Sequence, residues 1–234
     1  YPEKQFLVIV PEQFTMQTQK DLVRMHPRHG IMNIDVLSFE RLAHRVFGEV
    51  GGEHRRILED TGKNLILRRI AEEKKDELVL LGGNLKKLGY ISEVKSLLSE
   101  FTQYRMQPEE LRRVMEQNKE NPQLYFKLKD MLVIYESFRE YLEGMYLTAE
   151  ELLDALEQVV ERSETVRGSV IALDGYNGFT PVQMKLLQKL LGLAEEVCVT
   201  LTMDGREQPF VREAEYRLFH PTTKTALELA RLAD

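Results

Sequence analysis

Hydrophobic residues in this chain fall into short, mostly apolar runs and longer stretches with helical spacing. The short runs are residues 6–10, 34–37, 170–173 and 197–201. Such runs, bounded by Pro, Ser or Asp, are typical of strands buried on both faces of a parallel sheet. Helical patterns follow three of them, at residues 12–25, 38–50 and 181–191. Strands that alternate with helices predict an α/β domain with a parallel sheet.

The middle of the chain differs, because residues 57–166 show helical periodicity and almost no strand signal. One apolar set recurs with helical spacing and predicts a buried face: Ile91, Val94, Leu98, Phe101 and Tyr104. Another set predicts a coiled-coil-like seam: Leu124, Leu128, Met131, Tyr135, Phe138 and Leu142. Pro108 and Pro122 suit the first positions of two helices. We therefore expect an α/β domain formed by residues 1–52 and 167–234, interrupted by an all-helical insertion at residues 53–166.

The strand predicted at residues 170–173 ends in Asp174 and leads through a Gly-rich corner into a helix. Thr180 is a good N-cap, Pro181 suits the first helical position, and Gln183 completes a capping box. An apolar strand that ends in Asp before a turn has the form of a Walker B segment, in which Asp holds the Mg²⁺ of a bound nucleotide. This segment predicts a nucleotide-binding type of fold.

The same segment resembles motif II of superfamily-1 helicases, Asp-Glu-x-Gln-Asp-x-x-Pro-x-Gln. Asp174, Pro181 and Gln183 are in register with that pattern, but Gly175 stands where the catalytic Glu would be. A helicase needs that Glu to orient the attacking water, and Gly has no side chain to do so. The sequence therefore predicts a degenerate Walker B segment and a helicase fold without ATPase chemistry. No Gly-x-x-x-x-Gly-Lys-Ser/Thr phosphate loop occurs in the chain, and Thr61-Gly-Lys-Asn64 is interpreted as the first turn of a helix.

Composition limits the class of protein. The 234 residues are 43% hydrophobic and 30% charged, which is typical of an ordinary globular protein. The net charge of −6 argues against nucleic-acid binding through bulk positive charge, although it leaves room for a local site. No apolar run is long enough to span a bilayer. The chain begins at Tyr1 and ends within a predicted helix, so we expect a piece of a longer protein.

Cys198 is the one cysteine and lies in an apolar run, which predicts a buried structural thiol. A single cysteine excludes a disulfide framework and fits a reducing, cytoplasmic environment. The five histidines show no ligand spacing, so no metal site is expected in this chain.

Three predicted strand ends should meet at one edge of the sheet, where parallel α/β folds bind their ligands. The following corners are residues 11–16, 38–44 and 174–180, and they offer amide, hydroxyl, guanidinium and aromatic groups. These groups suit single-stranded nucleic acid, which proteins bind by base stacking, hydrogen bonds and Arg contacts. For Phe14 and Phe39 the alternative is that each packs its helix on the sheet, as buried aromatic residues commonly do.

Five segments of the chain carry a resemblance to a known family: Phe6-Leu-Val-Ile-Val-Pro-Glu-Gln-Phe-Thr, Asp35-Val-Leu-Ser-Phe-Glu-Arg-Leu-Ala-His-Arg-Val, Asp174-Gly-Tyr-Asn-Gly-Phe-Thr-Pro-Val-Gln, Leu201-Thr-Met-Asp and Leu218-Phe-His-Pro-Thr-Thr. In this order they resemble the AddB (RexB) subunits of AddAB helicase–nucleases. The third resembles the family's degenerate motif II, and the helical block between the second and third has the right size for the family's insertion.

The resemblance implies a P-loop-NTPase, superfamily-1 helicase-like domain (1A) that lacks its phosphate loop, with a large helical insertion (1B). It implies a non-motor subunit that works with an AddA-type motor in double-strand-break repair, guides a separated DNA strand and recognises a Chi sequence. The positions that match the family's DNA-binding residues are Gln13, Thr15, Phe39, Arg41, His44 and Phe179. Family cofactors are Mg²⁺, ATP and an iron–sulfur cluster, none of which is expected in this piece.

Two other functions remain open from the residues. An active superfamily-1 motor fragment would need an upstream phosphate loop and a compensating Glu at the sheet edge. A protein-interaction scaffold would use the helical block to dock a partner and leave the sheet edge inert.

Overall fold

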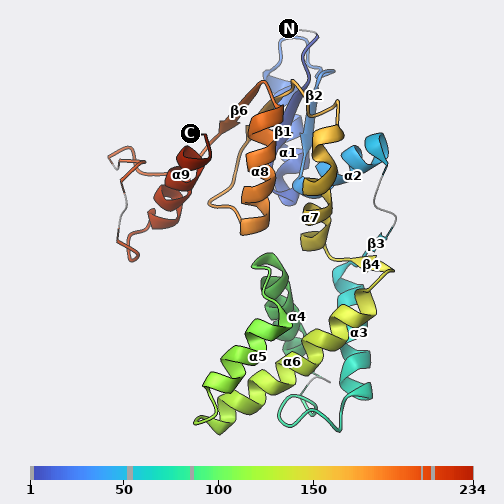
Figure 1. Cartoon of the computed structure of the whole chain (residues 1–234). Helices are drawn as coiled ribbons and strands as arrows, with labels where there is room; N and C mark the ends of the chain where they lie inside the picture. Colours follow the sequence, from blue (N-terminus) through green and yellow to red (C-terminus); the bar gives the residue numbers. More distant parts are fainter. Residues whose placement is uncertain (1–2, 52–54, 85–86, 207, 212–213, 234) are drawn as a thin grey trace. The chain divides into compact units, whose positions relative to one another are not determined.

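The computed structural model describes residues 3–51, 55–84, 87–206, 208–211 and 214–233. The chain divides into two compact units, one formed by Tyr1–Glu53 with Leu153–Asp234 and the other by His54–Leu152. The first unit contains a parallel sheet with helices, and the second consists mainly of helices (Figure 1). The α/β class predicted from the sequence is confirmed.

The sheet of the first unit has four parallel strands in the order β2-β1-β5-β6. Their bounds are β1 Phe6–Ile9, β2 Ile34–Leu37, β5 Val170–Leu173 and β6 Glu196–Val199. Phe6 pairs with Ile34 on one side and with Val170 on the other, so β1 and β5 are the inner strands. Leu7, Ile9 and Leu173 are fully buried, as continuous apolar strands of a covered sheet require.

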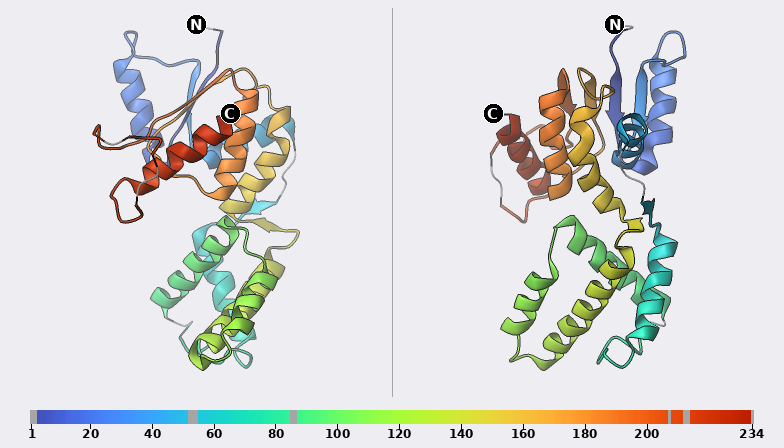
Figure 2. Two further views of the ribbon diagram at one scale, coloured as in Figure 1. Left: turned by 60° about the vertical axis from the view of Figure 1, so that its left-hand side comes forward. Right: turned by 45° about the vertical axis from the view of Figure 1, so that its right-hand side comes forward.

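Helices cover both faces of this sheet, with α1 on one side and α7 and α8 on the other (Figure 2). The helical segments that reach this unit are η1 Glu12–Phe14, α1 Thr15–Met25, α2 Phe39–Val50, α7 Ala149–Val159, η2 Val160–Arg162, α8 Pro181–Leu193 and α9 His220–Ala233. The predicted helix starts are confirmed. The Ser38 hydroxyl accepts a hydrogen bond from the N–H of Arg41, and Thr180 and Gln183 form the predicted capping box.

Glu49, near the end of α2, binds the segment that follows η2. Its carboxylate accepts hydrogen bonds from the Ser163 hydroxyl at 2.6 Å and from the N–H groups of Glu164 at 2.5 Å and Thr165 at 3.2 Å. Val160 and Val166 are fully buried next to this contact. The compact α/β unit includes residues 153–166, whereas the sequence analysis placed them in the insertion, because helical periodicity does not indicate which core a helix joins.

The helical unit has its own core. It contains β3 Arg56–Ile57, α3 Asp60–Glu73, α4 Leu88–Gln103, α5 Pro108–Gln117, α6 Pro122–Leu142 and β4 Tyr146–Leu147. Most residues of the two predicted apolar sets are buried here, but Tyr104 is 67% exposed because α4 ends at Gln103. The short parallel pair β3–β4 was not predicted, since two residues are too few to show an alternating pattern.

A buried carboxylate organises one turn of the helical unit. Asp130 on α6 is fully buried, and it accepts hydrogen bonds from the N–H groups of Val79 at 2.9 Å, Leu80 at 2.7 Å and Leu81 at 2.8 Å. These three donors would otherwise lack partners after α3 ends. The side chain thus fixes the turn between α3 and α4 against α6.

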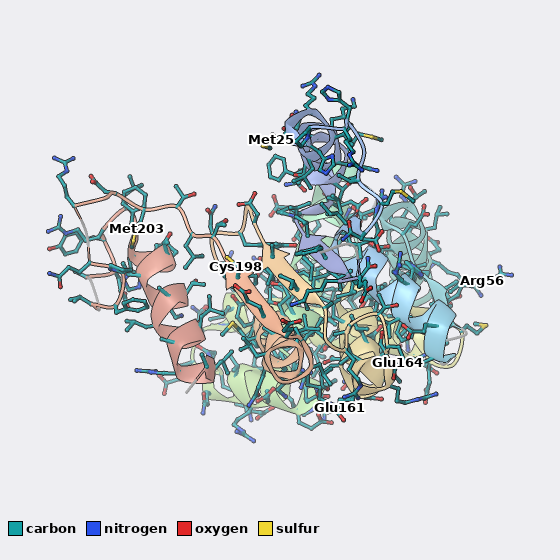
Figure 3. The ribbon with its side chains drawn as sticks, turned by 90° about the horizontal axis from the view of Figure 1, so that it is seen from above. Met25, Arg56, Glu161, Glu164, Cys198 and Met203 are labelled. Carbon is teal, nitrogen blue, oxygen red and sulfur yellow. The ribbon has the colours of Figure 1, made fainter. Side chains whose placement is uncertain are left out.

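Cys198 lies on β6 and is exposed (Figure 3), so the prediction of a buried thiol is wrong. Within the described residues β6 is an outer strand of the sheet, and Glu196 and Cys198 share its exposed face. An apolar run does not distinguish an inner strand from an outer one. Among the helices of the described ranges, none is both long and apolar enough to cross a membrane.

Candidate functional site

All four parallel strands end at the same edge of the sheet, and the corners that follow β1, β2 and β5 contact one another there. We call this region the strand-end site; it comprises residues 11–15, 38–44 and 174–180. In parallel α/β sheets this edge is where ligands bind, because loops and helix starts converge on it. The sequence predicted this convergence, and the structure brings the three corners together.

An ion pair joins the first two corners. Arg41 donates a hydrogen bond from Nε to the Glu12 carboxylate at 2.9 Å, and its Nη2 forms an ion pair with the same oxygen at 2.8 Å. Hydrogen bonds hold the pKa of Glu12 below its usual value, with the larger contribution from the Ser38 hydroxyl and the smaller from Arg41. Both charged side chains are about half exposed, at 55% and 52%, so a ligand can reach the guanidinium. Glu12 occupies the position where an external anion would pair with Arg41.

Three aromatic rings connect the second and third corners. The rings of Phe39 and Tyr176 have centroids 5.6 Å apart, and those of Tyr176 and Phe179 are 5.2 Å apart. Phe39 is only 5% exposed, whereas Tyr176 and Phe179 are partly exposed. Burial, followed by the charge of Glu12, raises the pKa of Tyr176, so its hydroxyl stays neutral near pH 7. Tyr176 was not among the predicted binding residues, although it lies in the predicted third corner.

Gly175, in the third corner, lies close to Pro11 and Phe14 of the first corner. Its φ is +79°, a region that side chains of L-amino acids disfavour. A Cβ atom at this position would lie 3.4 Å from Cδ of Pro11 and 3.7 Å from the ring of Phe14. The corner therefore requires glycine, and a glutamate at position 175 would strain this backbone.

Asp174, the carboxylate of the predicted Walker B segment, is exposed and accepts a hydrogen bond from the hydroxyl of Thr200. In the part of the chain that the structure describes, no group of three His, Cys, Asp or Glu residues could hold a metal ion. A single cysteine does not fit an iron–sulfur cluster. The chain also lacks the phosphate-loop motif that would hold ATP.

The remaining predicted residues differ in accessibility. Gln13 is exposed on η1, whereas Thr15 is 6% exposed and its hydroxyl donates to the carbonyl of Glu12 at 2.9 Å. His44 is exposed, one turn beyond Arg41 on α2, with Nε2 4.0 Å from the Glu40 carboxylate. Phe14, which sequence reasoning left open as a packing residue, is 47% exposed. The accessible groups are an amide, a guanidinium, an imidazole and several aromatic rings, a set that favours binding over bond making.

The comparisons with known proteins agree on one family. A family model described as "ADDB, N-terminal" matches residues 1–234. The chain is 48% identical over 232 residues to a protein of Lachnoclostridium phytofermentans and 37% identical over 232 residues to one of Alkaliphilus metalliredigens, in each case with 99% of this chain aligned. A third relative, from Moorella thermoacetica, is 36% identical over 234 residues.

All three relatives carry the same name, which describes each as one subunit of an ATP-dependent helicase/deoxyribonuclease. The chain spans about a fifth of the length of each, since the alignments cover 20% of these proteins. The family match extends over the whole chain and over both units. The chain therefore belongs to the ADDB N-terminal family.

Proposed function

We propose that this chain is the N-terminal part of a non-motor subunit of a DNA-processing helicase–nuclease, and that its strand-end site binds single-stranded DNA. The names of its relatives support a helicase–nuclease subunit, and the role in double-strand-break repair follows from the family resemblance. The observation that carries the DNA site is the meeting of Gln13, Arg41 and the Tyr176–Phe179 ring pair at one edge of a parallel sheet.

In this proposal each accessible group has one task. The rings of Tyr176 and Phe179 stack on bases, and the Gln13 amide reads base edges through hydrogen bonds. Arg41 exchanges the Glu12 carboxylate for a phosphate of the strand. Phe39 and Thr15 are buried, so they position the neighbouring groups and do not contact DNA directly.

The finer features of the proposal follow the family. The α/β unit corresponds to a helicase-like domain 1A without its phosphate loop, the helical unit to an insertion 1B, and an AddA-type subunit supplies the motor. The strand read at the sheet edge is then one that carries a Chi regulatory sequence, and the complex acts in the cytoplasm. Gly175 supports the absence of ATP hydrolysis, because the corner requires glycine where a motor needs glutamate.

The proposal is tested by fluorescence anisotropy with labelled single-stranded oligonucleotides of varied sequence. We expect Gln13→Ala and Phe179→Ala each to weaken binding about tenfold, because base stacking alone contributes ~1–3 kcal/mol per base. Gln19→Ala, an exposed glutamine further along α1, and Phe210→Ala, an exposed phenylalanine outside the site, are the matched controls. Equal binding by all four variants would contradict a DNA site at this edge and favour a scaffold function.

The role of Arg41 has a separate test. Replacing Glu12 by Gln removes a negative charge from the site and releases the guanidinium, so we expect Glu12→Gln to bind oligonucleotide a few-fold more tightly. Arg41→Ala should bind less tightly by a similar or larger factor, since each lost phosphate contact weakens binding uniformly across sequences. If Glu12→Gln bound less tightly than the unaltered chain, Arg41 would have a purely structural role.

A further inference from the structure

A basic surface separate from the strand-end site lies in the helical unit, beside the paired strands β3 and β4. It is a hollow of about 320 Å³ lined by Arg55, Arg56, Gly144, Met145 and Tyr146. Acidic residues outnumber basic ones in the chain, 38 to 32. Nevertheless, the described residues that line this hollow include two arginines and no acid. We call it the ribbon hollow.

The backbone of the two strands sets which side chains reach the ribbon hollow. Arg56 and Tyr146 are paired Cα partners in the parallel ladder, so their side chains lie next to each other on one face. The N–H of Arg56 donates to the carbonyl of Met145 at 3.1 Å, and that of Leu58 to the carbonyl of Leu147 at 2.7 Å. This pairing holds the arginine and the aromatic ring in fixed register.

The pair is anchored in the core of the helical unit, and Tyr146 is itself partly buried against that core. Leu147 is 2% exposed, whereas Met145 is 61% exposed and Arg56, labelled in Figure 3, is exposed. Gly144, with φ +74°, allows the chain to turn from α6 into β4 without a side chain in the hollow. Arg56 and Met145 therefore give the hollow an exposed side, next to a pair of strands that is packed on the core.

The chemistry of these side chains matches one strand of nucleic acid. Guanidinium groups bind phosphate through paired N–H donors, and a tyrosine ring and a thioether offer apolar contact to a sugar or base. A folded protein surface would need more apolar area than this hollow provides. We propose that the ribbon hollow binds the sugar–phosphate backbone of single-stranded DNA, with Arg55 and Arg56 on phosphates and Tyr146 against a sugar or base.

This second contact rests on the proposed function, since it assumes that the chain binds single-stranded DNA, and it adds a site that reads no sequence. The test measures binding of labelled oligothymidylate of about twelve nucleotides, a length within the usual site sizes of single-strand binders, to the whole chain. We expect Arg55→Ala/Arg56→Ala to weaken binding about tenfold at low salt and to reduce the slope of log K against log salt by about 1.4, which is 0.7 for each of two phosphate contacts.

The matched control is Arg68→Ala/Lys75→Ala, which removes two exposed positive charges from α3 and the segment after it and changes net charge equally. It should leave both affinity and slope close to those of the unaltered chain. Arg55→Lys/Arg56→Lys, which keeps the charges, should recover most of the slope. If Arg68→Ala/Lys75→Ala lost as much affinity as Arg55→Ala/Arg56→Ala, the ribbon hollow would be overturned as a site, because the change in net charge alone would explain both losses.

Two further outcomes separate this proposal from others. If Arg55→Ala/Arg56→Ala binds the oligonucleotide normally while Phe179→Ala does not, the ribbon hollow is overturned and the strand-end site stands. If the unaltered chain binds no oligonucleotide, both proposals fail together. Inorganic phosphate, added at the phosphate concentration of the oligonucleotide, should not compete; effective competition would indicate an isolated anion site and overturn the strand proposal.

Discussion

At the scale of single residues, Gly175 shows how a position in a sequence motif depends on backbone geometry. The resemblance to helicase motif II predicts that glycine stands where a glutamate would be, and the structure adds φ +79° and the nearby ring of Pro11 at this position. A glutamate introduced at position 175 would therefore meet a structural obstacle.

We expect Gly175→Ala to lower the free energy of unfolding by about 1–2 kcal/mol, the usual cost of a left-handed backbone for an L residue. Urea unfolding, monitored by circular dichroism, measures this change in the free energy of unfolding. Gly192→Ala is the control, because Gly192 lies in α8 and a Cβ atom there would meet nothing within 4 Å. Gly192→Ala should raise the free energy of unfolding by up to ~1 kcal/mol, because alanine favours a helix more than glycine does. Equal effects at the two positions would show that the corner accepts side chains.

The Tyr176 ring illustrates what residue patterns leave undetermined. A tyrosine between two glycines in a loop has no periodicity, so its contacts with Phe39 and Phe179 come only from the folding of two distant corners onto each other. The same holds for Glu12, whose partner Arg41 is on another helix.

At the scale of elements, Asp130 joins the turn after α3 to helix α6. Replacing it by Asn places an amide group among three N–H donors, so at least one donor loses its partner. An unsatisfied buried donor costs ~1–3 kcal/mol, and we expect Asp130→Asn to destabilise the helical unit by about 3 kcal/mol. Hydrogen exchange should show lost protection at Val79, Leu80 and Leu81.

Asp76→Asn makes the same chemical change at an exposed position of the helical unit and serves as the control. It should leave the exchange rates of those three amides unchanged. Unaltered protection in Asp130→Asn would mean that water or another group can replace the carboxylate.

Glu49 predicts a dependence of stability on pH. Burial acts to raise its pKa, but hydrogen bonds from Ser163 and Thr165 and from the N–H of Glu164 outweigh burial and hold the pKa below the usual 4.5. A carboxyl group with a lowered folded-state pKa stabilises the fold fully above its unfolded-state pKa, and the contribution is lost as the pH falls through the folded-state pKa.

Glu49→Gln should therefore be less stable than the unaltered chain at pH 7, by about 1 kcal/mol because the carboxylate is exposed. The difference should shrink below pH 4.5 as the native carboxylate takes up its proton. Urea unfolding of both proteins between pH 7 and pH 3 measures this difference. A gap that stays constant over that range would indicate that the charge of Glu49 contributes nothing.

At the scale of the whole molecule, the chain divides into two compact units, and an ATPase assay tests the proposal that this chain is not a motor. We expect the purified chain with Mg²⁺ and single-stranded DNA to release phosphate from ATP at the background rate only. This sequence contains no phosphate-loop motif, and the resemblance to helicase motif II predicts that Gly175 stands where a motor has the residue that orients water. A malachite-green phosphate assay is sufficient.

Asp174→Ala provides the control for contaminating ATPases. If the unaltered chain released phosphate in a DNA-stimulated way and Asp174→Ala did not, the activity would belong to this chain and the proposed inactivity would be wrong. Equal background rates in both proteins are the expected result.

Local patterns determined much of this molecule. Continuous apolar runs specified the four parallel strands, and capping residues such as Ser38 and Thr180 specified where helices begin. These features depend on neighbours within one element, so a single sequence reveals them. The order of the corners along the chain also predicted that Gln13, Arg41 and Phe179 would gather at one sheet edge, because the carboxyl ends of parallel strands always meet there.

The tertiary structure alone decided the properties that depend on distant contacts. Burial separates Phe39 and Thr15 from the accessible residues of the strand-end site, and the outer position of β6 exposes Cys198. Compact packing places residues 153–166 in the α/β unit, and the contacts of Glu49 bind Ser163 and Glu164 to α2. The sequence by itself determined the elements, since these follow from local spacing, and it determined the family through the resemblance of its motifs and the match of its whole length. The accessibility of each side chain was decided by which elements pack together, because burial is a property of the assembled core.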